Sequence, residues 1–174
     1  MKRKLTIKFI YLAVTMMLCL GVSFSAKAQT YTGGNLQSGK LASAVAVDAN
    51  GNVYVVQFNS GTPNGGGGTG AVVMYAHNNL SGTPTTIATG IPDDDNAAND
   101  YATGIVVDPT TGDVFVLSDN EDANNIAPFG IIYKIKNNGG GTFAAKTPWI
   151  TGNSDLGFPA AIAVDGSGNI YVDE

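Results

Sequence analysis

Beyond residue 28 the sequence has no cysteine and no arginine, a single histidine, His77, and a single tryptophan, Trp149. Without cysteine no disulfide is available, so packing must stabilise the fold. A Ser-His-Asp triad or a histidine-based zinc site would depend on His77 alone, which stands in an asparagine-rich turn. We therefore interpret His77 as a turn residue and assign no catalytic residue.

Positive charge is also scarce, and most of it lies at the N-terminus. Four basic residues precede an apolar run over residues 9–20, and Ala26-Lys27-Ala28 forms a small-x-small cleavage site. This pattern predicts a signal peptide, residues 1–28, and a secreted or periplasmic product. An uncleaved anchor is the alternative, although the run is short for a membrane span. The basic residues are Lys2, Arg3, Lys4 and Lys8.

The remaining chain is strongly acidic. Residues 29–174 contain four lysines against fourteen acidic residues, which gives a net charge of −10. Such a surface repels phosphate backbones, which proteins neutralise with lysine and arginine, so no nucleic-acid partner is expected. No long apolar run follows residue 28, so no membrane partner is expected after cleavage. The charge suits binding of a cation.

One pattern occurs three times: an apolar run that ends in Asp, a turn rich in Gly, and an alternating run with a central aromatic. The copies span residues 44–55, 103–116 and 161–172. The apolar run predicts a strand with both faces buried. We expect each aspartate to cap its own turn through Asx hydrogen bonds, a ring of metal ligands being the alternative. These aspartates are Asp48, Asp108 and Asp165.

The copies belong to longer units of four short strands, and no helical period is present after residue 28. The pattern predicts an all-β fold of four-stranded antiparallel blades, a β-propeller-type repeat, with a sandwich as the alternative. The lead-in is residues 29–41, and the blades are about 42–90, 102–151 and 160–174. The expected strands are 42–48, 52–58, 71–76, 85–89, 103–108, 113–118, 130–135, 146–150, 160–165 and 169–172, with 136–145 as a loop.

About two and a half blades do not close a propeller, which needs at least about four. We therefore expect the sequence to be a fragment of a longer repeat protein. A short protein that assembles from several copies is the alternative, and open blade edges are expected to self-associate.

The motif itself resembles a known family. Ile-Ala-Val-Asp-x-x-Gly-Asn-Ile-Tyr-Val at residues 162–172, with variants at 45–55 and 105–116, is similar to the NHL repeat and to propeller repeats of the SMP-30/gluconolactonase superfamily. Residues 100–105 are similar to the bacterial SBBP repeat. The resemblance implies a six-bladed or similar propeller in full-length relatives. Its lactonase branch holds a divalent metal with an early Glu, and residues 29–120 contain no Glu to match.

Alternate loops of a four-stranded blade emerge on opposite faces. The longer loops, near residues 59–70, 90–101, 119–129 and 151–159, are therefore expected on one face, where they gather acidic side chains. Such oxygens are ligands that Ca²⁺ takes, although their spacing differs from an EF-hand. Acids that only interact with solvent are the alternative. The candidate metal ligands are Asp93, Asp94, Asp95, Asp100, Asp119, Glu121 and Asp122.

These observations predict an exported repeat module that binds a protein or a glycan through its acidic loop face and acts as a scaffold. A metal-dependent hydrolase, lactonase or lyase of the gluconolactonase type is the second hypothesis, and a repeat within a larger surface protein is the third. Trp149, in the last strand of the second unit, is interpreted as a partly buried edge aromatic, with stacking on a sugar as the alternative.

Overall fold

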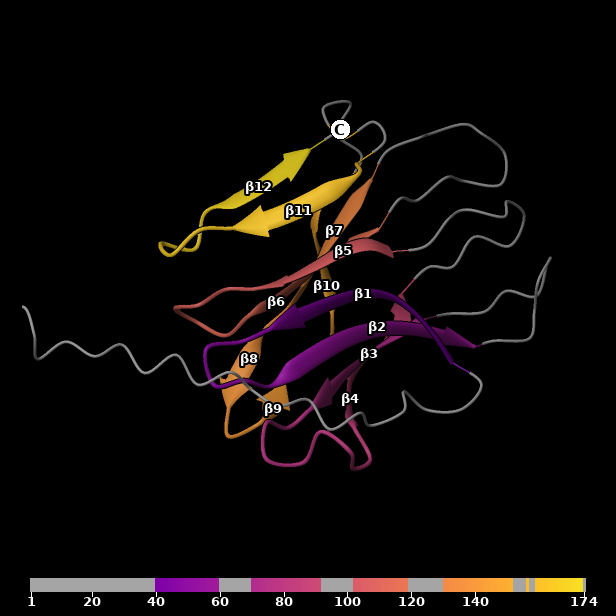
Figure 1. Cartoon of the computed structure of the whole chain (residues 1–174). Helices are drawn as coiled ribbons and strands as arrows, with labels where there is room; N and C mark the ends of the chain where they lie inside the picture. Colours follow the sequence, from indigo (N-terminus) through magenta and orange to yellow (C-terminus); the bar gives the residue numbers. More distant parts are fainter. Residues whose placement is uncertain are drawn as a thin grey trace, which may run out of the picture. The chain divides into compact units, whose positions relative to one another are not determined.

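Strands and turns, without any helix, make up the part of the chain that the computed structural model describes (Figure 1). That part lies within one compact unit, Gly33–Glu174. None of its elements is a helix long and apolar enough to cross a membrane. The all-β fold class predicted from the sequence is confirmed. The described residues are 40–59, 70–91, 102–118, 130–151, 156 and 159–173.

The first sheet has four antiparallel strands in chain order, β1-β2-β3-β4. Its strands are rich in valine and other β-branched residues, which favour the pleated backbone. Val45 pairs with Val55, and Val55 pairs with Val73, so these three side chains share one face of the sheet. The strands are β1 (Lys40–Val47), β2 (Val53–Asn59), β3 (Gly70–Tyr75) and β4 (Thr85–Ile91).

A second four-stranded sheet repeats this order as β5-β6-β7-β10, and a further hairpin, β11-β12, follows it. All ten expected strands are present, with ends that differ from the expected ones by at most two residues. The strands are β5 (Ala102–Val107), β6 (Val114–Ser118), β7 (Ile131–Ile135), β10 (Thr147–Ile150), β11 (Ala161–Val164) and β12 (Ile170–Asp173).

The prediction of a loop over residues 136–145 was wrong. This segment contains a small hairpin, β8 (Asn137–Gly139) and β9 (Thr142–Phe143), whose turn uses glycines with positive φ at 139, 140 and 141. The Phe143 ring meets Tyr54 of the first sheet edge-on, with centroids 6.2 Å apart. The hairpin is therefore held by packing against the first sheet, which glycine-rich sequence alone did not indicate.

The sheets pack face to face in chain order. One core cluster joins Tyr54, Val56 and Val72 of the first sheet to Val116 and Ile135 of the second. The other face of the second sheet packs on β11-β12, through a cluster of Phe115, Leu117 and Ile132 with Ile162 and Val172. The first strands, β1, β5 and β11, lie beside one another across these interfaces (Figure 1). Each sheet therefore buries apolar side chains against the next one.

The first strand of the first sheet departs from the expected burial. Val45 and Val47 are 64% and 59% exposed, whereas the equivalent Ile105 and Val107 of β5 are 5% and 8% exposed. The first sheet covers that face of β5. No described sheet packs on the corresponding face of β1, so the prediction of two buried faces was wrong for this strand.

Candidate functional site

The predicted metal ligands all lie outside the described residues. These are Asp93, Asp94, Asp95, Asp100, Asp119, Glu121 and Asp122. The structure does describe the strand ends that flank them, which are the ends of β4 and β5 and of β6 and β7. The ends of β2 and β3 and of β10 and β11 bound the two other long connections. In an antiparallel meander these ends lie on one side, which we call the loop end, and the tight turns lie on the other, the turn end (Figure 1).

At the turn end, Asp48 organises the turn between β1 and β2. Its Oδ1 accepts the backbone N–H groups of Asn50 and Asn52, both at 2.9 Å. Its Oδ2 accepts the side-chain amide of Asn52 at 2.8 Å and the Tyr54 hydroxyl at 3.1 Å. Gly51 closes the turn with a φ of 83°. Burial, together with the nearby Asp48 charge, raises the pKa of Tyr54 to about 12.

Asp165 repeats this arrangement between β11 and β12. Ser167 and Asn169 donate backbone N–H groups to Oδ1 at 2.9 and 2.8 Å. The Asn169 amide and the Tyr171 hydroxyl donate to Oδ2 at 2.7 and 3.1 Å. The hydrogen bonds from Asn169 are the main reason that the pKa of Asp165 falls to about 2. The same bonding in two distant copies shows that the motif specifies its own turn.

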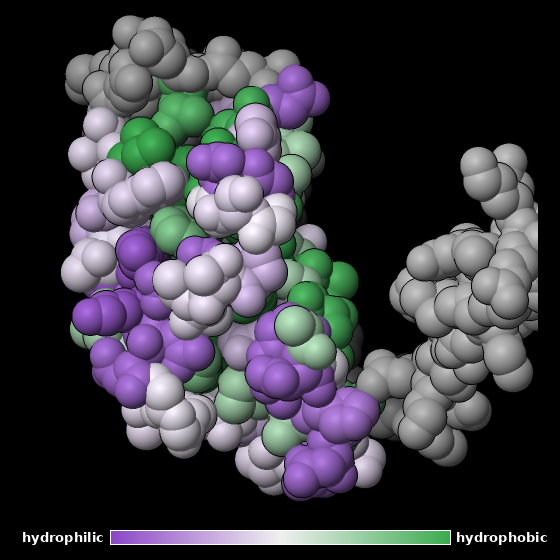
Figure 2. Space-filling view, turned by 90° about the vertical axis from the view of Figure 1, so that its left-hand side faces the viewer, coloured by the Kyte–Doolittle hydropathy of each residue, from purple (hydrophilic) through white to green (hydrophobic). Residues whose placement is uncertain are grey.

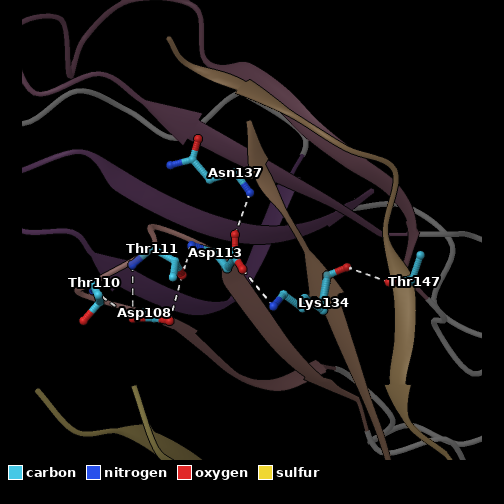
Figure 3. Close-up of polar contacts among 7 residues, drawn as sticks. All are labelled: Asp108, Thr110, Thr111, Asp113, Lys134, Asn137 and Thr147. Carbon is cyan, nitrogen blue, oxygen red and sulfur yellow. Dashed lines mark hydrogen bonds and ion pairs between the residues drawn. The ribbon is translucent and has the colours of Figure 1, made fainter. Parts of the chain in front are cut away.

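Asp108 makes a variant of the same turn (Figure 3). Thr110 and Thr111 donate backbone N–H groups to its Oδ1 at 2.8 and 3.3 Å, and the Thr111 hydroxyl donates to Oδ2 at 2.7 Å. Burial alone would raise the pKa of Asp108, but these hydrogen bonds outweigh it and lower the pKa. Thr111 thus takes the part that Asn52 has in the first copy.

All three repeat aspartates therefore cap their own turns, as the sequence predicted. Each carboxylate accepts several hydrogen bonds from its own turn. Capping of the turn is therefore enough to explain why Asp recurs at this position. Within the described ranges, no three His, Cys, Asp or Glu side chains gather in a way that could hold a metal ion.

Sequence reasoning missed a second polar position, which joins the first hairpin to the third strand. Asn52 Oδ1 accepts the His77 backbone N–H at 3.0 Å. The equivalent Asp113 accepts the Asn137 backbone N–H at 2.8 Å and pairs with Lys134 at 2.8 Å (Figure 3). Burial raises the pKa of Asp113, but the hydrogen bond and charge of Lys134 outweigh it and lower the pKa. Alignment of the three copies could have found this position.

His77 and Trp149 lie as the sequence suggested. His77 is an exposed residue of the turn after β3, at the turn end. Trp149 is 47% exposed on β10, and its ring stacks at a tilt on Phe115, with centroids 4.9 Å apart. The Lys134 ammonium lies 5.3 Å from the centre of the same Phe115 ring. Trp149 therefore covers Phe115 with part of its surface.

Polar groups dominate the surface of the turn end. Figure 2 shows that hydrophilic and near-neutral residues cover much of this side, with hydrophobic residues between them. The polar groups of the turn residues form hydrogen bonds within their own turns, as in the Asp48 and Asp165 turns. This end therefore has a structural role that its sequence explains.

Comparison with known proteins adds no assignment. No protein-family model matches the sequence, and neither does any curated protein. The similarity to propeller repeats therefore depends on the motif of the first hairpin in each unit.

Proposed function

We propose that the chain is an exported β-propeller-type repeat module that binds a protein or a glycan at its loop end and acts as a scaffold. One observation carries the proposal. Two four-stranded antiparallel meanders and a third hairpin stack face to face, with their first strands side by side. Consecutive blades of a propeller have this relation, whereas a sandwich pairs only two sheets.

The loop end supports the choice of binding surface. The strand ends there bound four segments, 60–69, 92–101, 119–130 and 151–160, and the sequence places acidic residues in the last three of them. At the turn end, by contrast, carboxylates such as Asp48 and Asp165 already accept hydrogen bonds from their own turns. Loops on a rigid scaffold are where binding residues are commonly found.

The second candidate is a metal-dependent hydrolase, lactonase or lyase of the gluconolactonase type. The motif resemblance is the ground for it, but residues 29–120 contain no Glu to match the early metal ligand of that branch. Its metal ligands would have to come from outside the described residues. The seven acidic candidates, which lie between Asp93 and Asp122, supply oxygen ligands that suit Ca²⁺. Their chemistry is the reason to test calcium together with binding.

The test uses the purified chain on glycan and peptide arrays, with and without Ca²⁺. We expect capture by at least one of these classes. A loop variant, Asp119→Asn with Asp122→Asn, should lose most of that capture, and the turn-end control Asn138→Ala should retain it. Capture that is indifferent to the loop variant, or no capture on either array, would contradict the proposal.

Calcium has a separate readout. If the acidic loops bind Ca²⁺, millimolar Ca²⁺ raises the melting temperature of the wild-type chain by mass action, and the loop variant shows a smaller rise. An unchanged melting temperature removes calcium from the proposal. Turnover of a lactone that requires a divalent metal and is lost in the loop variant would favour the enzyme instead.

A further inference from the structure

The two internal interfaces are built in the same way at their first strands. Ala44 and Ala46 of β1 pack in the core cluster that contains Ile105 and Val107 of β5. One repeat later, Gly104 of β5 faces Ile162 of β11 so closely that a Cβ at Gly104 would lie 2.6 Å from the Ile162 Cγ2 methyl. Each interface thus joins a face with small residues to a face with branched ones.

The central aromatic of each copy shows what covers the small-residue face. Tyr54 is 2% exposed under the second sheet, and Phe115 is 4% exposed under β11-β12. Tyr171, at the same repeat position, is 57% exposed. Tyr171 pairs across the hairpin with Ala163, so both side chains share the uncovered face.

The outermost described faces are therefore two different halves of one interface. We define the β1 face as Val45 and Val47, which are 64% and 59% exposed. The Tyr171 face consists of the exposed residues Ala161, Ala163, Tyr171 and Asp173. The β1 face corresponds to the branched side of β5, which is buried, and the Tyr171 face corresponds to the small-residue side of β1, which is covered.

The rest of the first sheet limits the exposed area to its first strand. On the same side, Val55, Val73 and Tyr75 form a separate buried cluster. Only β1 leaves large apolar side chains exposed there, among the described residues. In both internal interfaces the first strands lie beside one another. A β11-β12 hairpin that packed on β1 in the same way would cover the exposed strand.

We propose that the β1 face of one copy packs on the Tyr171 face of a second copy, head to tail. Val45 and Val47 on one face, and Ala163 and Tyr171 on the other, occupy the positions that form the internal interfaces. Asp173 stands where those interfaces bury Val56 and Leu117, so its carboxylate would lie at the edge of the contact. Such a contact is heterologous, and it closes into a ring or continues as a chain of copies. The inference goes beyond the proposed function and does not depend on binding at the loop end.

Two variants test the direction of packing. Val45→Lys with Val47→Lys places charge on the β1 face, and Ala163→Lys with Tyr171→Lys places it on the Tyr171 face. We expect the wild-type chain to self-associate with concentration in sedimentation equilibrium, and each variant to associate at least about tenfold more weakly. An equimolar mixture of the two variants should form a 1:1 dimer and stop there, because each contributes its intact face.

The controls separate this contact from other modes of association. Asn138→Lys, at an exposed position of β8, should behave as wild type. Circular dichroism checks the fold, and Val45→Thr with Val47→Thr replaces the lysine variant if that variant unfolds. A wild-type chain that stays monomeric at every concentration, or a single face variant that still dimerises through a strand edge or through two identical faces, would overturn the proposal.

Discussion

At the scale of single residues, one carboxylate sets the geometry of each repeat turn. Asp48 and Asp165 each accept four hydrogen bonds from residues two to six positions later, with closely similar distances. An ionised carboxylate can accept that many because it has two oxygens and no donor of its own. In the Asp165 turn, the bonds that fix the turn also stabilise the charge on the carboxylate.

This stabilisation predicts the titration of Asp165. Its carboxylate should titrate with a pKa of about 2, below the usual 3.8, since Asn169 donates to both oxygens. Because the folded pKa is depressed, the stabilising effect is present above the unfolded pKa and is lost as the pH falls towards about 2. Carboxyl ¹³C NMR measures the midpoint directly.

Removal of the Asn169 side chain provides the comparison for that titration. In Asn169→Ala the Asp165 midpoint should move up towards 3.8, whereas the turn-end control Asn138→Ala should leave it in place. A wild-type midpoint near 3.8 would contradict the hydrogen-bonded geometry.

The bond from Tyr54 to Asp48 makes a second prediction. Asp48→Ala leaves the hydroxyl of Tyr54, a residue only 2% exposed, without this acceptor, which should lower the free energy of unfolding by about 1–3 kcal/mol. When Tyr54 is already replaced by Phe, Asp48→Ala should lower the free energy of unfolding by less. A double-mutant cycle therefore yields the coupling energy between the two side chains. Urea unfolding of the four proteins measures it, and strictly additive effects would show that the bond contributes nothing.

At the scale of elements, burial depends on the neighbouring sheet and not on the strand's own sequence. Val47 and Val107 end equivalent strands and follow similar apolar runs, yet they are 59% and 8% exposed. The same holds for Tyr171 against Tyr54 and Phe115. Alternation within a strand defines which residues share a face, but only packing decides whether that face is covered.

The two valines are a matched pair for measuring this effect. Val107→Ala removes two buried methyl groups, and we expect a loss of roughly 2 kcal/mol in the free energy of unfolding. Val47→Ala removes the same groups from an exposed site and should change it by less than about 0.5 kcal/mol. Denaturant unfolding at low protein concentration, where copies do not associate, makes the comparison. Equal losses would contradict the stacking order.

At the scale of the whole molecule, the repeat was the most informative signal in the sequence. Apolar runs ending in Asp, followed by turns with glycine at 51, 112 and 168, located the strands and their connections, because positive-φ turns and β-branched runs are local properties. The β8-β9 hairpin was missed since it depends on contact between Phe143 and Tyr54, which are far apart in the chain.

The candidate site could be predicted only in part. The role of the repeated Asp followed from its local turn, and the structure confirms it. The ion pair joins Asp113, just before β6, to Lys134 of β7, and Asp113 also accepts the backbone N–H of Asn137. These partners are far apart in the chain, so no local pattern indicated the contact. That the acidic loop residues bind a ligand or Ca²⁺ stays a prediction, which the array and calcium experiments test.

The central claim is that successive sheets stack with their first strands side by side, and one disulfide tests it most directly. The Cβ position built at Gly104 lies 3.6 Å from the Ile162 Cβ, within the range that a disulfide needs. In a Cys19→Ser background no other cysteine is present. Gly104→Cys with Ile162→Cys should therefore oxidise to an intramolecular disulfide, with loss of both free thiols.

The matched control is Gly104→Cys with Ala163→Cys, because Ala163 points to the opposite face of β11. The stacking predicts that this control keeps its thiols under the same oxidation, as measured by thiol titration and by mass spectrometry of the cross-linked peptides. Equal oxidation of both pairs, or two free thiols after oxidation in the protein that combines Gly104→Cys with Ile162→Cys, would contradict it.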